Sequence, residues 1–259
     1  MSRSINLSEH VRPILAAIQS VPIPAKFGQE APEPIVPFVT ISREVGVGAW
    51  TLAQQLADAL NRDEGGEKAW TCWDRELVEK VAADFRLSQH LVESLEETAH
   101  SWLTDFFESL NLADDPSEAT EMTVLKKVAQ TVRALAQAGR VILVGRGGFL
   151  LTRKMPGGVH VRLDAPLEYR IVHMMRHLNV PREKAAQEVR ELSRCRAAFF
   201  KRYWPNEVIS PDLFTVTLNT AIVSQETCVK IIMDLVEDVI ARQTRVPATP
   251  PVAEMSARR

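Results

Sequence analysis

Cysteine is scarce in this chain of 259 residues, which contains three copies, Cys72, Cys195 and Cys228. They are widely spaced and form no Cys-x-x-Cys pair, so their pattern fits neither a disulfide framework nor a metal or redox motif. We therefore expect a reducing compartment.

Long apolar runs and an excess of one charge are also missing. No segment approaches the roughly 20 apolar residues that span a bilayer, and the opening residues, MSRSINLSEHVRPIL, lack the hydrophobic block of a signal peptide. The formal net charge of −2 gives no overall field that would attract nucleic acid or an acidic membrane. These absences predict a cytoplasmic protein that binds neither nucleic acid nor membrane and whose anion sites are built locally, and they leave its oligomeric state open.

Proline is abundant near one end of the chain. Five prolines lie between Val21 and Pro37, which predicts an N-terminal appendage with a Pro-rich linker over residues 1–36. Residues 243–259 combine proline with small and charged residues and have no apolar period, as in a disordered tail. The folded domain is therefore predicted over residues 37–242.

Apolar runs and helical stripes alternate within that domain. The runs PFVTIS (37–42) and RVILVG (140–145) are continuous and predict central buried strands, whereas the alternation at 159–163 and 214–218 predicts strands nearer an edge. A weaker fifth strand is AWTCW (69–73). Helical patterns between these runs indicate an α/β fold with a parallel sheet wrapped by helices.

Two further segments of the domain have a distinct pattern. Residues 87–139 hold no convincing strand and predict a helical insertion, and the arginine-rich residues 190–206 suit a mobile lid of cations that closes over polyphosphate.

The segment SREVGVGAW nearly spells a phosphate-binding loop, GxxxxGK(S/T), in which main-chain amides and a lysine bind phosphate oxygens. Gly46 and Gly48 allow close approach of the backbone, and a helix predicted from Leu52 onward offers an N-terminus that attracts anions. Ala49 stands at the lysine position. Losing one positioned donor costs roughly 3 to 4 kcal/mol of transition-state stabilisation, so a phosphotransferase needs a replacement cation. The alternative is an ordinary strand-to-helix turn.

Several charged residues are candidates for that site. Arg43 enters the loop and is the nearest replacement cation, unless it is simply solvated. Arg146 follows a buried strand, where open parallel sheets bind ligands, although it could instead pair with a carboxylate. Asp74 lies between a strand and a helix, where N-capping is the alternative role, and Arg75 beside it is either acceptor-facing or solvated. Asp164 is explained by helix capping.

The segment RELSRCRAAFFKRYW places Arg196 in a helical stripe with Leu192, Phe199 and Tyr203. A cation on an apolar face needs an anion, so we expect Arg196 to meet either an internal carboxylate or a ligand phosphate. Arg194 is a second candidate of the lid, although such residues are often solvated surface charges. His173 and His177 have helical i,i+4 spacing but lack the rest of a zinc-binding motif, and we predict no metal site in the protein itself.

The motifs SREVGVGAW, WDRELVEKVA, VGRGG, DAPLEYRI and SRCRAAFFKRYW follow in an order that resembles the cytidylate-kinase-like family of P-loop kinases, from about Phe38 to Ala241. The resemblance implies a three-layer fold with a five-stranded parallel sheet, an NMP-binding helical insertion and an arginine lid. It also implies transfer of the γ-phosphoryl group of ATP, with Mg²⁺, to CMP, dCMP or a related small acceptor.

The resemblance, together with the charge argument, assigns the site residues. Donor binding is assigned to Gly46, Val47, Gly48, Ala49, Trp50 and Thr51. Acceptor binding is assigned to Asp74, Arg75, Arg146 and Arg196, and catalysis to Arg43, Arg146, Arg194 and Arg196. Ala49, Trp50 and Ser193 depart from the family pattern. The alternative function is therefore a nucleotide-binding sensor or partner-binding protein that kept the fold and lost the chemistry.

Overall fold

The computed structural model describes residues 35–64, 69–74, 76, 78, 116–145 and 147–245. The elements in chain order are β1 (Phe38–Arg43), α2 (Ala49–Glu64), β2 (Thr71–Asp74), α6 (Pro116–Ala138), β3 (Val141–Val144), α7 (Gly148–Thr152), β4 (Gly158–Asp164), α8 (Leu167–Leu178), α9 (Arg182–Tyr203), the 3₁₀ turn η1 (Pro211–Leu213), β5 (Val216–Asn219) and α10 (Gln225–Arg245).

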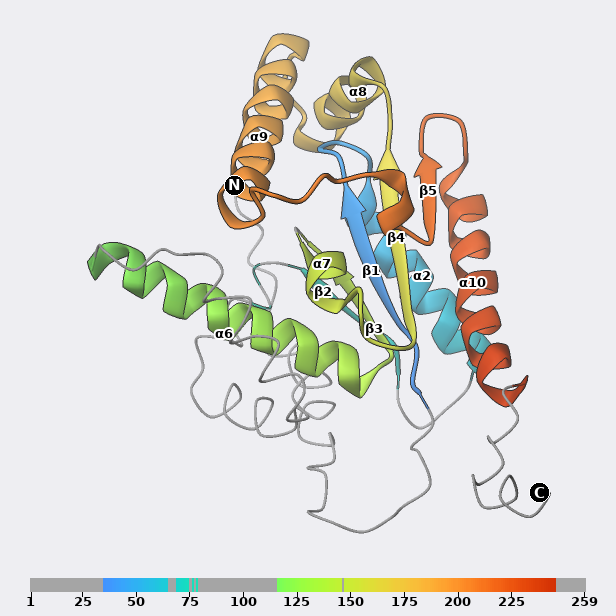
Figure 1. Ribbon diagram of the computed structural model, residues 1–259. Helices are drawn as coiled ribbons and strands as arrows, with labels where there is room; N and C mark the ends of the chain where they lie inside the picture. Colours follow the sequence, from blue (N-terminus) through green and yellow to red (C-terminus); the bar gives the residue numbers. More distant parts are fainter. Residues whose placement is uncertain are drawn as a thin grey trace, which may run out of the picture.

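The five strands form one parallel sheet in the order β2-β3-β1-β4-β5 (Figure 1). This confirms the predicted α/β fold and all five predicted strands. The two continuous apolar runs are β1 and β3, which lie inside the sheet, and the weaker run became the edge strand β2. Burial on both faces explains why β1 and β3 lack an apolar and polar alternation.

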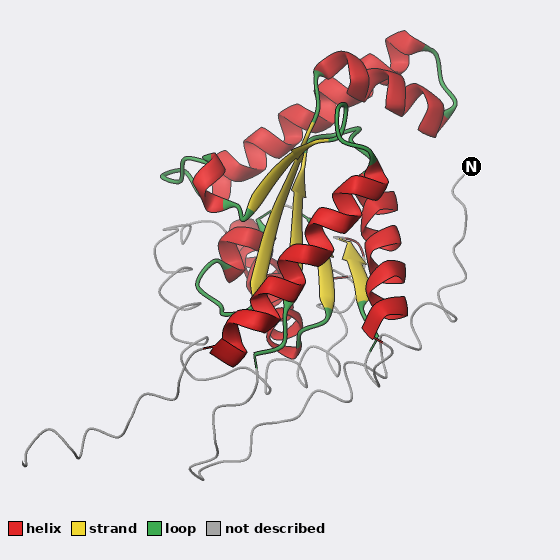
Figure 2. Ribbon diagram, turned by 90° about the vertical axis from the view of Figure 1, so that its right-hand side faces the viewer, coloured by secondary structure: helices red, strands yellow, loops and turns green. Residues whose placement is uncertain are grey.

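Helices cover both faces of the sheet, which gives three layers. Figures 1 and 2 show α2 and α10 on one face, and α6 with α7 on the other. Leu52, Leu56 and Leu60 recur at i+4 along α2 and are at most 2% exposed, because this stripe packs on the sheet. The opposite face has its own core, which includes Phe38, Phe149 and the aromatic end of α9.

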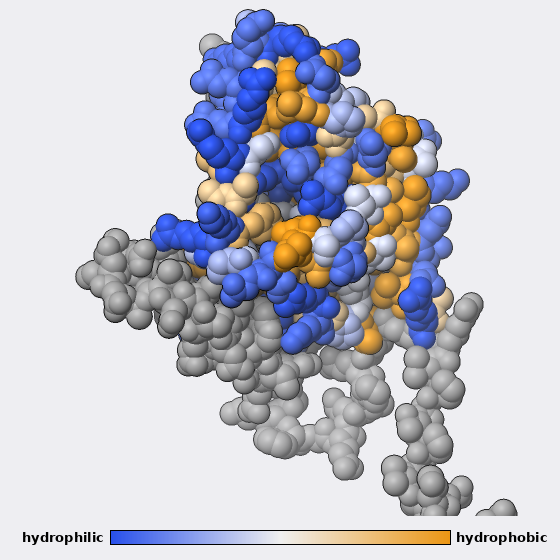
Figure 3. All heavy atoms as spheres, turned by 45° about the horizontal axis from the view of Figure 1, so that its top comes forward, coloured by the Kyte–Doolittle hydropathy of each residue, from blue (hydrophilic) through white to orange (hydrophobic). Residues whose placement is uncertain are grey.

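Helices α8 and α9 form a hairpin that projects beyond the carboxyl ends of the strands (Figures 1 and 2). Its surface is mainly hydrophilic in Figure 3. The hairpin has a small apolar cluster in which Ile171 and Val189 pack with Val45, a residue of the connection between β1 and α2. The hairpin is therefore attached to the expected phosphate loop.

Parts of the predicted organisation lie outside the described residues. These are residues 1–34 of the appendage, 79–115, which include the first part of the helical insertion, and 246–259 of the tail. The rest of the insertion is mostly helix α6, and the lid-like residues 190–206 comprise the second half of α9 and the chain just after it. None of the described helices is both long enough and apolar enough to cross a bilayer.

Candidate functional site

Residues 44–48 connect β1 to α2 by a turn that requires glycine. Gly46 has φ of +86° and Gly48 has φ of +75°, a region that disfavours side chains. A Cβ atom on Gly46 would lie 2.6 Å from the main-chain oxygen of Arg170, and one on Gly48 would lie 2.7 Å from Nε2 of Gln225. The amide of Leu52 donates to the Gly48 oxygen at 3.1 Å, and α2 begins at Ala49 rather than at Leu52 as predicted.

Ionic contacts hold the entrance of this loop. The Glu44 carboxylate accepts from Arg162 at 3.4 Å and from Arg170 at 3.5 Å, and Arg170 also donates to the main-chain oxygen of Val45 at 3.4 Å. Arg162 pairs with Asp164 at 2.9 Å. Asp164, expected as a helix cap, thus belongs to a charged network that joins the ends of β1 and β4 to α8.

The first turn of α2 carries the residues that replace the usual lysine sequence. Ala49, at the position of the usual lysine, is 7% exposed and belongs to the core beneath α2. Trp50 is 39% exposed, and Thr51 is also exposed. The first turn of α2 therefore carries no cationic side chain.

Arg196 links the hairpin to the end of β1. Its Nη1 atom donates to the main-chain oxygen of Arg43 at 2.5 Å. We expected a carboxylate or a ligand phosphate as partner, and this contact is to a carbonyl oxygen. The predicted apolar stripe is half right: Phe199 and Tyr203 join the core of the α6 face, whereas Leu192 is 43% exposed because α9 has already left the sheet there.

Ser193 and Arg194 lie next to this link but differ in their surroundings. Ser193 accepts from Nη1 of Arg170 at 3.5 Å, so this residue, which departs from the family pattern, faces the charged network. Arg194 is exposed on α9. Of the two lid arginines, Arg196 is thus anchored over the end of β1 and Arg194 lies at the surface.

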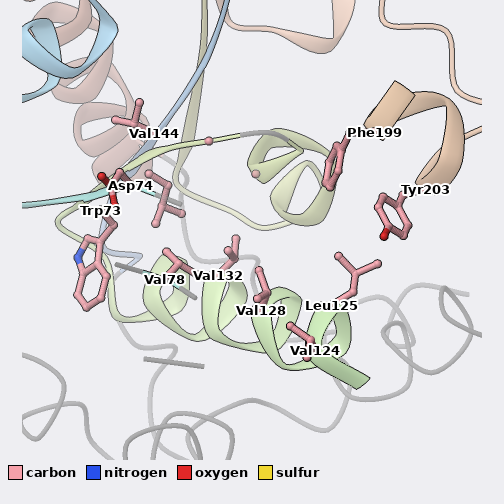
Figure 4. A pocket seen from close by; sticks show the side chains of 13 residues that line it. Trp73, Asp74, Val78, Val124, Leu125, Val128, Val132, Val144, Phe199 and Tyr203 are labelled. Carbon is pink, nitrogen blue, oxygen red and sulfur yellow. The ribbon is translucent and has the colours of Figure 1, made fainter. Parts of the chain in front are cut away.

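A cavity of about 240 Å³ opens between α6 and α9 at the carboxyl ends of β2 and β3. Figure 4 shows Val124, Leu125, Val128 and Val132 of α6 on one side and Phe199 and Tyr203 of α9 on the other. Trp73, Asp74, Val78, Leu143, Val144, Gly145 and Gly148 complete the described lining. Asp74 is the only charged residue among these described lining residues, so the cavity is an apolar slot with one carboxylate.

The cavity and the loop lie side by side at the carboxyl ends of the strands. Asp74 pairs with Val144, and Val144 pairs with Ile41 of β1, so two strand spacings of about 4.8 Å separate Asp74 from β1. Glu76, two residues after Asp74, is helical, as the capping reading of Asp74 requires. Arg75 and Arg146 lie outside the described residues.

The buried His160 and the partly buried Cys72, both in the sheet, have shifted pKa values. Burial lowers the pKa of His160 on β4 to about 4, and its Nδ1 atom hydrogen-bonds the Thr40 hydroxyl of β1 at 2.8 Å. Burial, with a smaller effect of the Asp58 charge, raises the pKa of Cys72 on β2 to about 12, and its thiol donates to the Ala53 carbonyl. Both groups are uncharged at neutral pH.

Sequence reasoning missed Glu44 within the loop and three residues that lie against it: Arg170, His173 and Gln225. Glu44 and Arg170 lie inside the motifs SREVGVGAW and DAPLEYRI, so a charge search within those motifs would have found them. His173 was considered only as a metal ligand, and Gln225 carries no sequence signal.

Comparison with known proteins bears on this arrangement. No protein with a curated function matches the chain. A structure of an uncharacterized protein from Eubacterium ventriosum superposes with a TM-score of 0.56 at 15% identity, covering 78% of this chain and 98% of that one. Shikimate kinase from Bacteroides thetaiotaomicron matches at a TM-score of 0.42 and 13% identity, over 78% of this chain and 98% of that one, and this lower score adds no argument.

A family of proteins matches over the whole sheet and the hairpin. Residues 38–222 fit the pattern of the family described as "Cytidylate kinase-like family". This range runs from the first residue of β1 to the connection between β5 and α10. It includes the glycine loop, Asp74 and the arginines of α9. The chain belongs to the cytidylate kinase-like family.

Proposed function

We propose that this protein is an ATP-dependent phosphotransferase that moves the γ-phosphoryl group to CMP, dCMP or a related small acceptor. Family membership supports a kinase-like, nucleotide-binding protein. The observation that carries the finer proposal is the juxtaposition of two half-sites. A glycine loop at a helix N-terminus follows β1, and a cavity opens beside it at the carboxyl ends of β2 and β3 in the same sheet. Transfer between two bound molecules requires such neighbouring sites.

The loop fits a polyphosphate. Gly46 and Gly48 keep side chains away from the backbone, and the N-terminus of α2 adds free amide donors. The donor site comprises Gly46, Val47, Gly48, Ala49, Trp50 and Thr51. Mg²⁺ keeps several waters and binds mainly through substrate phosphates, so it needs little from the protein, and Thr51 is the hydroxyl residue in the first turn. Bound Mg²⁺ would neutralise phosphate charge.

Arginines supply the charge that the missing lysine would have given. Arg196, anchored on the Arg43 carbonyl, holds the hairpin against the end of β1, and Arg43 itself leads into the loop. Arg194 is exposed on the same helix and is carried with it. In this proposal Arg43, Arg194 and Arg196 neutralise the transferring phosphoryl group, and Arg146 anchors the acceptor. Catalysis by positioning and charge needs no general base.

The cavity takes the acceptor. Val128, Phe199 and the other apolar lining residues enclose a ring, and the Asp74 carboxylate accepts a hydrogen bond from an amino or hydroxyl group. Arg75, Arg146 and Arg196 complete the acceptor site on the sequence argument. Acceptor identity is thus decided by Asp74 and the apolar walls.

A second candidate is a nucleotide-binding sensor that has lost the chemistry. Ala49 favours it, because this side chain is packed in the core where a P-loop lysine would be needed. Trp50 and Ser193 also depart from the family pattern, and these departures likewise favour a sensor. A sensor keeps nucleotide binding and loses transfer.

One experiment separates the two functions. The full chain is incubated with ATP, Mg²⁺ and CMP, dCMP, UMP or AMP, ADP release is followed, and nucleotide-induced thermal stabilisation is measured in parallel. Turnover with one monophosphate supports the transferase, stabilisation without turnover selects the sensor, and neither response refutes both. Arg196→Ala should reduce turnover roughly a hundredfold if it acts as a positioned donor. Arg190→Ala, an exposed arginine on the same helix, is the matched control.

A further inference from the structure

Two side chains from distant elements meet at Gly48. A Cβ atom there would lie 3.3 Å from Nε2 of His173, on α8, and 2.7 Å from Nε2 of Gln225, the first residue of α10. Gly48 is the last residue before α2 and directly precedes Ala49, the position of the missing lysine. Hydrogen-bond donors therefore approach the loop next to the place from which a P-loop lysine would extend.

The ring of His173 is held in position from both sides along its helix. Tyr169 and His177 stack on it with ring centroids 6.4 Å away in each case and interplanar angles of 22° and 15°. The three residues are spaced at i,i+4, so they occupy one face of α8. This stack orients the plane of the imidazole ring.

The two nitrogens of His173 have different surroundings. Nδ1 is buried and has no hydrogen-bond partner among the described residues, whereas Nε2 is the nitrogen that approaches Gly48. An N–H group buried without an acceptor costs more than a lone pair left unused in the same place, so the proton of the neutral ring belongs on Nε2. Burial lowers the pKa of His173, with smaller contributions from His177 and Arg176, which favours this neutral form.

We propose that Nε2–H of His173 and the side-chain amide of Gln225 bind the polyphosphate of the donor at Gly48, in place of the absent lysine. This inference rests on the proposed function, since it names residues of the same donor site. The ligand chemistry is a triphosphate, either free or as part of a nucleotide. Two neutral donors replace the hydrogen bonds of an ammonium group but not its charge, which remains the task of the arginines.

The test exploits the difference between the two ring nitrogens. In His173→Gln the side-chain amide nitrogen reaches the position of Nε2, and in His173→Asn it reaches only the position of Nδ1. Isothermal titration of the full chain with MgATP, and separately with inorganic tripolyphosphate, measures Kd for both probes. We expect His173→Asn to raise the Kd of both probes about tenfold or more, because the lost hydrogen bond is to a charged oxygen. In His173→Gln both Kd values should stay within about threefold of those of the native chain.

The control is His177→Gln, which changes the other end of the same stack and should alter either Kd by less than about twofold. The melting temperature of the unliganded variants gives a second readout, which a role in ligand binding leaves nearly unchanged. Three results would overturn the inference. The Asn and Gln variants of His173 could lose affinity equally, or His177→Gln could lose as much affinity as His173→Asn. The third is weaker binding of MgATP with unchanged binding of tripolyphosphate.

Failure of the inference and failure of the proposed function give different results. If the native chain binds tripolyphosphate in a manner that depends on His173 but transfers no phosphoryl group, the inference stands and the transferase falls. If transfer occurs and substitution of His173 changes neither Kd, the transferase stands and the inference falls. A native chain that binds neither probe refutes the inference and the donor site together.

Discussion

The candidate site has two halves, the loop half (residues 44–48 with the first turn of α2) and the cavity half (the residues that line the cavity). Both lie at the carboxyl ends of the strands of one sheet but are built differently. The loop half depends on main-chain conformation, with Gly46 and Gly48 in the left-handed region and Glu44 held by two arginines. The cavity half depends on side chains, chiefly the valines and leucine of α6 and the aromatic residues of α9. Under the proposed function, the donor site is fixed by the fold, whereas the acceptor site can be altered by single side-chain changes.

The largest expected effect comes from adding one methyl group to the loop. In Gly46→Ala the side chain would be strained by φ of +86° and would lie 2.6 Å from a main-chain oxygen that cannot rotate away. The left-handed penalty and the overpacking together should reduce the free energy of unfolding by about 4 kcal/mol. Urea denaturation of both forms, followed by circular dichroism, measures this loss.

The matched control is the same change in the cavity half. A Cβ atom on Gly145 would meet no atom of the described part of the chain within 4 Å, so Gly145→Ala should alter the free energy of unfolding by less than about 0.5 kcal/mol. Similar losses in the two variants would show that the loop is no more constrained than the cavity wall, and the comparison between the halves would fail.

The sheet and the glycine loop could be predicted from the sequence because each depends on neighbouring residues. Continuous apolar runs indicated β1 and β3, alternation indicated β4 and β5, and the pair Gly46 and Gly48 after a strand indicated the turn. These signals are local, since a buried strand needs apolar residues along its whole length and a left-handed turn needs glycine where it occurs.

The contacts that complete the loop could not be predicted in the same way. Gly48 meets His173 and Gln225, which are more than a hundred residues further along the chain, and periodicity carries no information on that pairing. A charge on an apolar face predicts that Arg196 has a partner but does not identify the Arg43 carbonyl. Leu192 follows the helical period and is nevertheless exposed, because none of the described elements covers α9 at this residue.

An intermediate effect is expected when the pH is lowered, and it concerns the core beneath the cavity half. His160 packs edge-on against Phe38 in that core, and its pKa is about 4 in the folded state against 6.5 for an ordinary histidine. Between these values the unfolded chain binds more protons, so the free energy of unfolding falls as the pH falls from 6.5 to 4. It is unaffected by this group above 6.5. The loss should total about 3 kcal/mol.

The contribution of His160 is isolated by a variant that does not titrate. In His160→Gln the free energy of unfolding should fall less steeply over this pH range. Above pH 7 the curves of the native chain and the variant should have the same slope. Carboxylates elsewhere affect both proteins alike. Parallel curves from pH 4 to 6.5 would mean that His160 is not the group that senses acid in this core.

The smallest effect is expected in the cavity wall, where binding changes more than folding. Val128 of α6 is partly buried and lines the cavity. Val128→Ala removes apolar surface that the acceptor would cover, so the KM for the best monophosphate acceptor should rise about fivefold, equivalent to about 1 kcal/mol, while the KM for ATP stays the same. Val208→Ala, the same change at a residue that is 79% exposed outside the cavity lining, should alter neither constant. A rise in both KM values for Val128→Ala would show that the cavity wall also shapes the donor site, and the two halves could no longer be treated as independent.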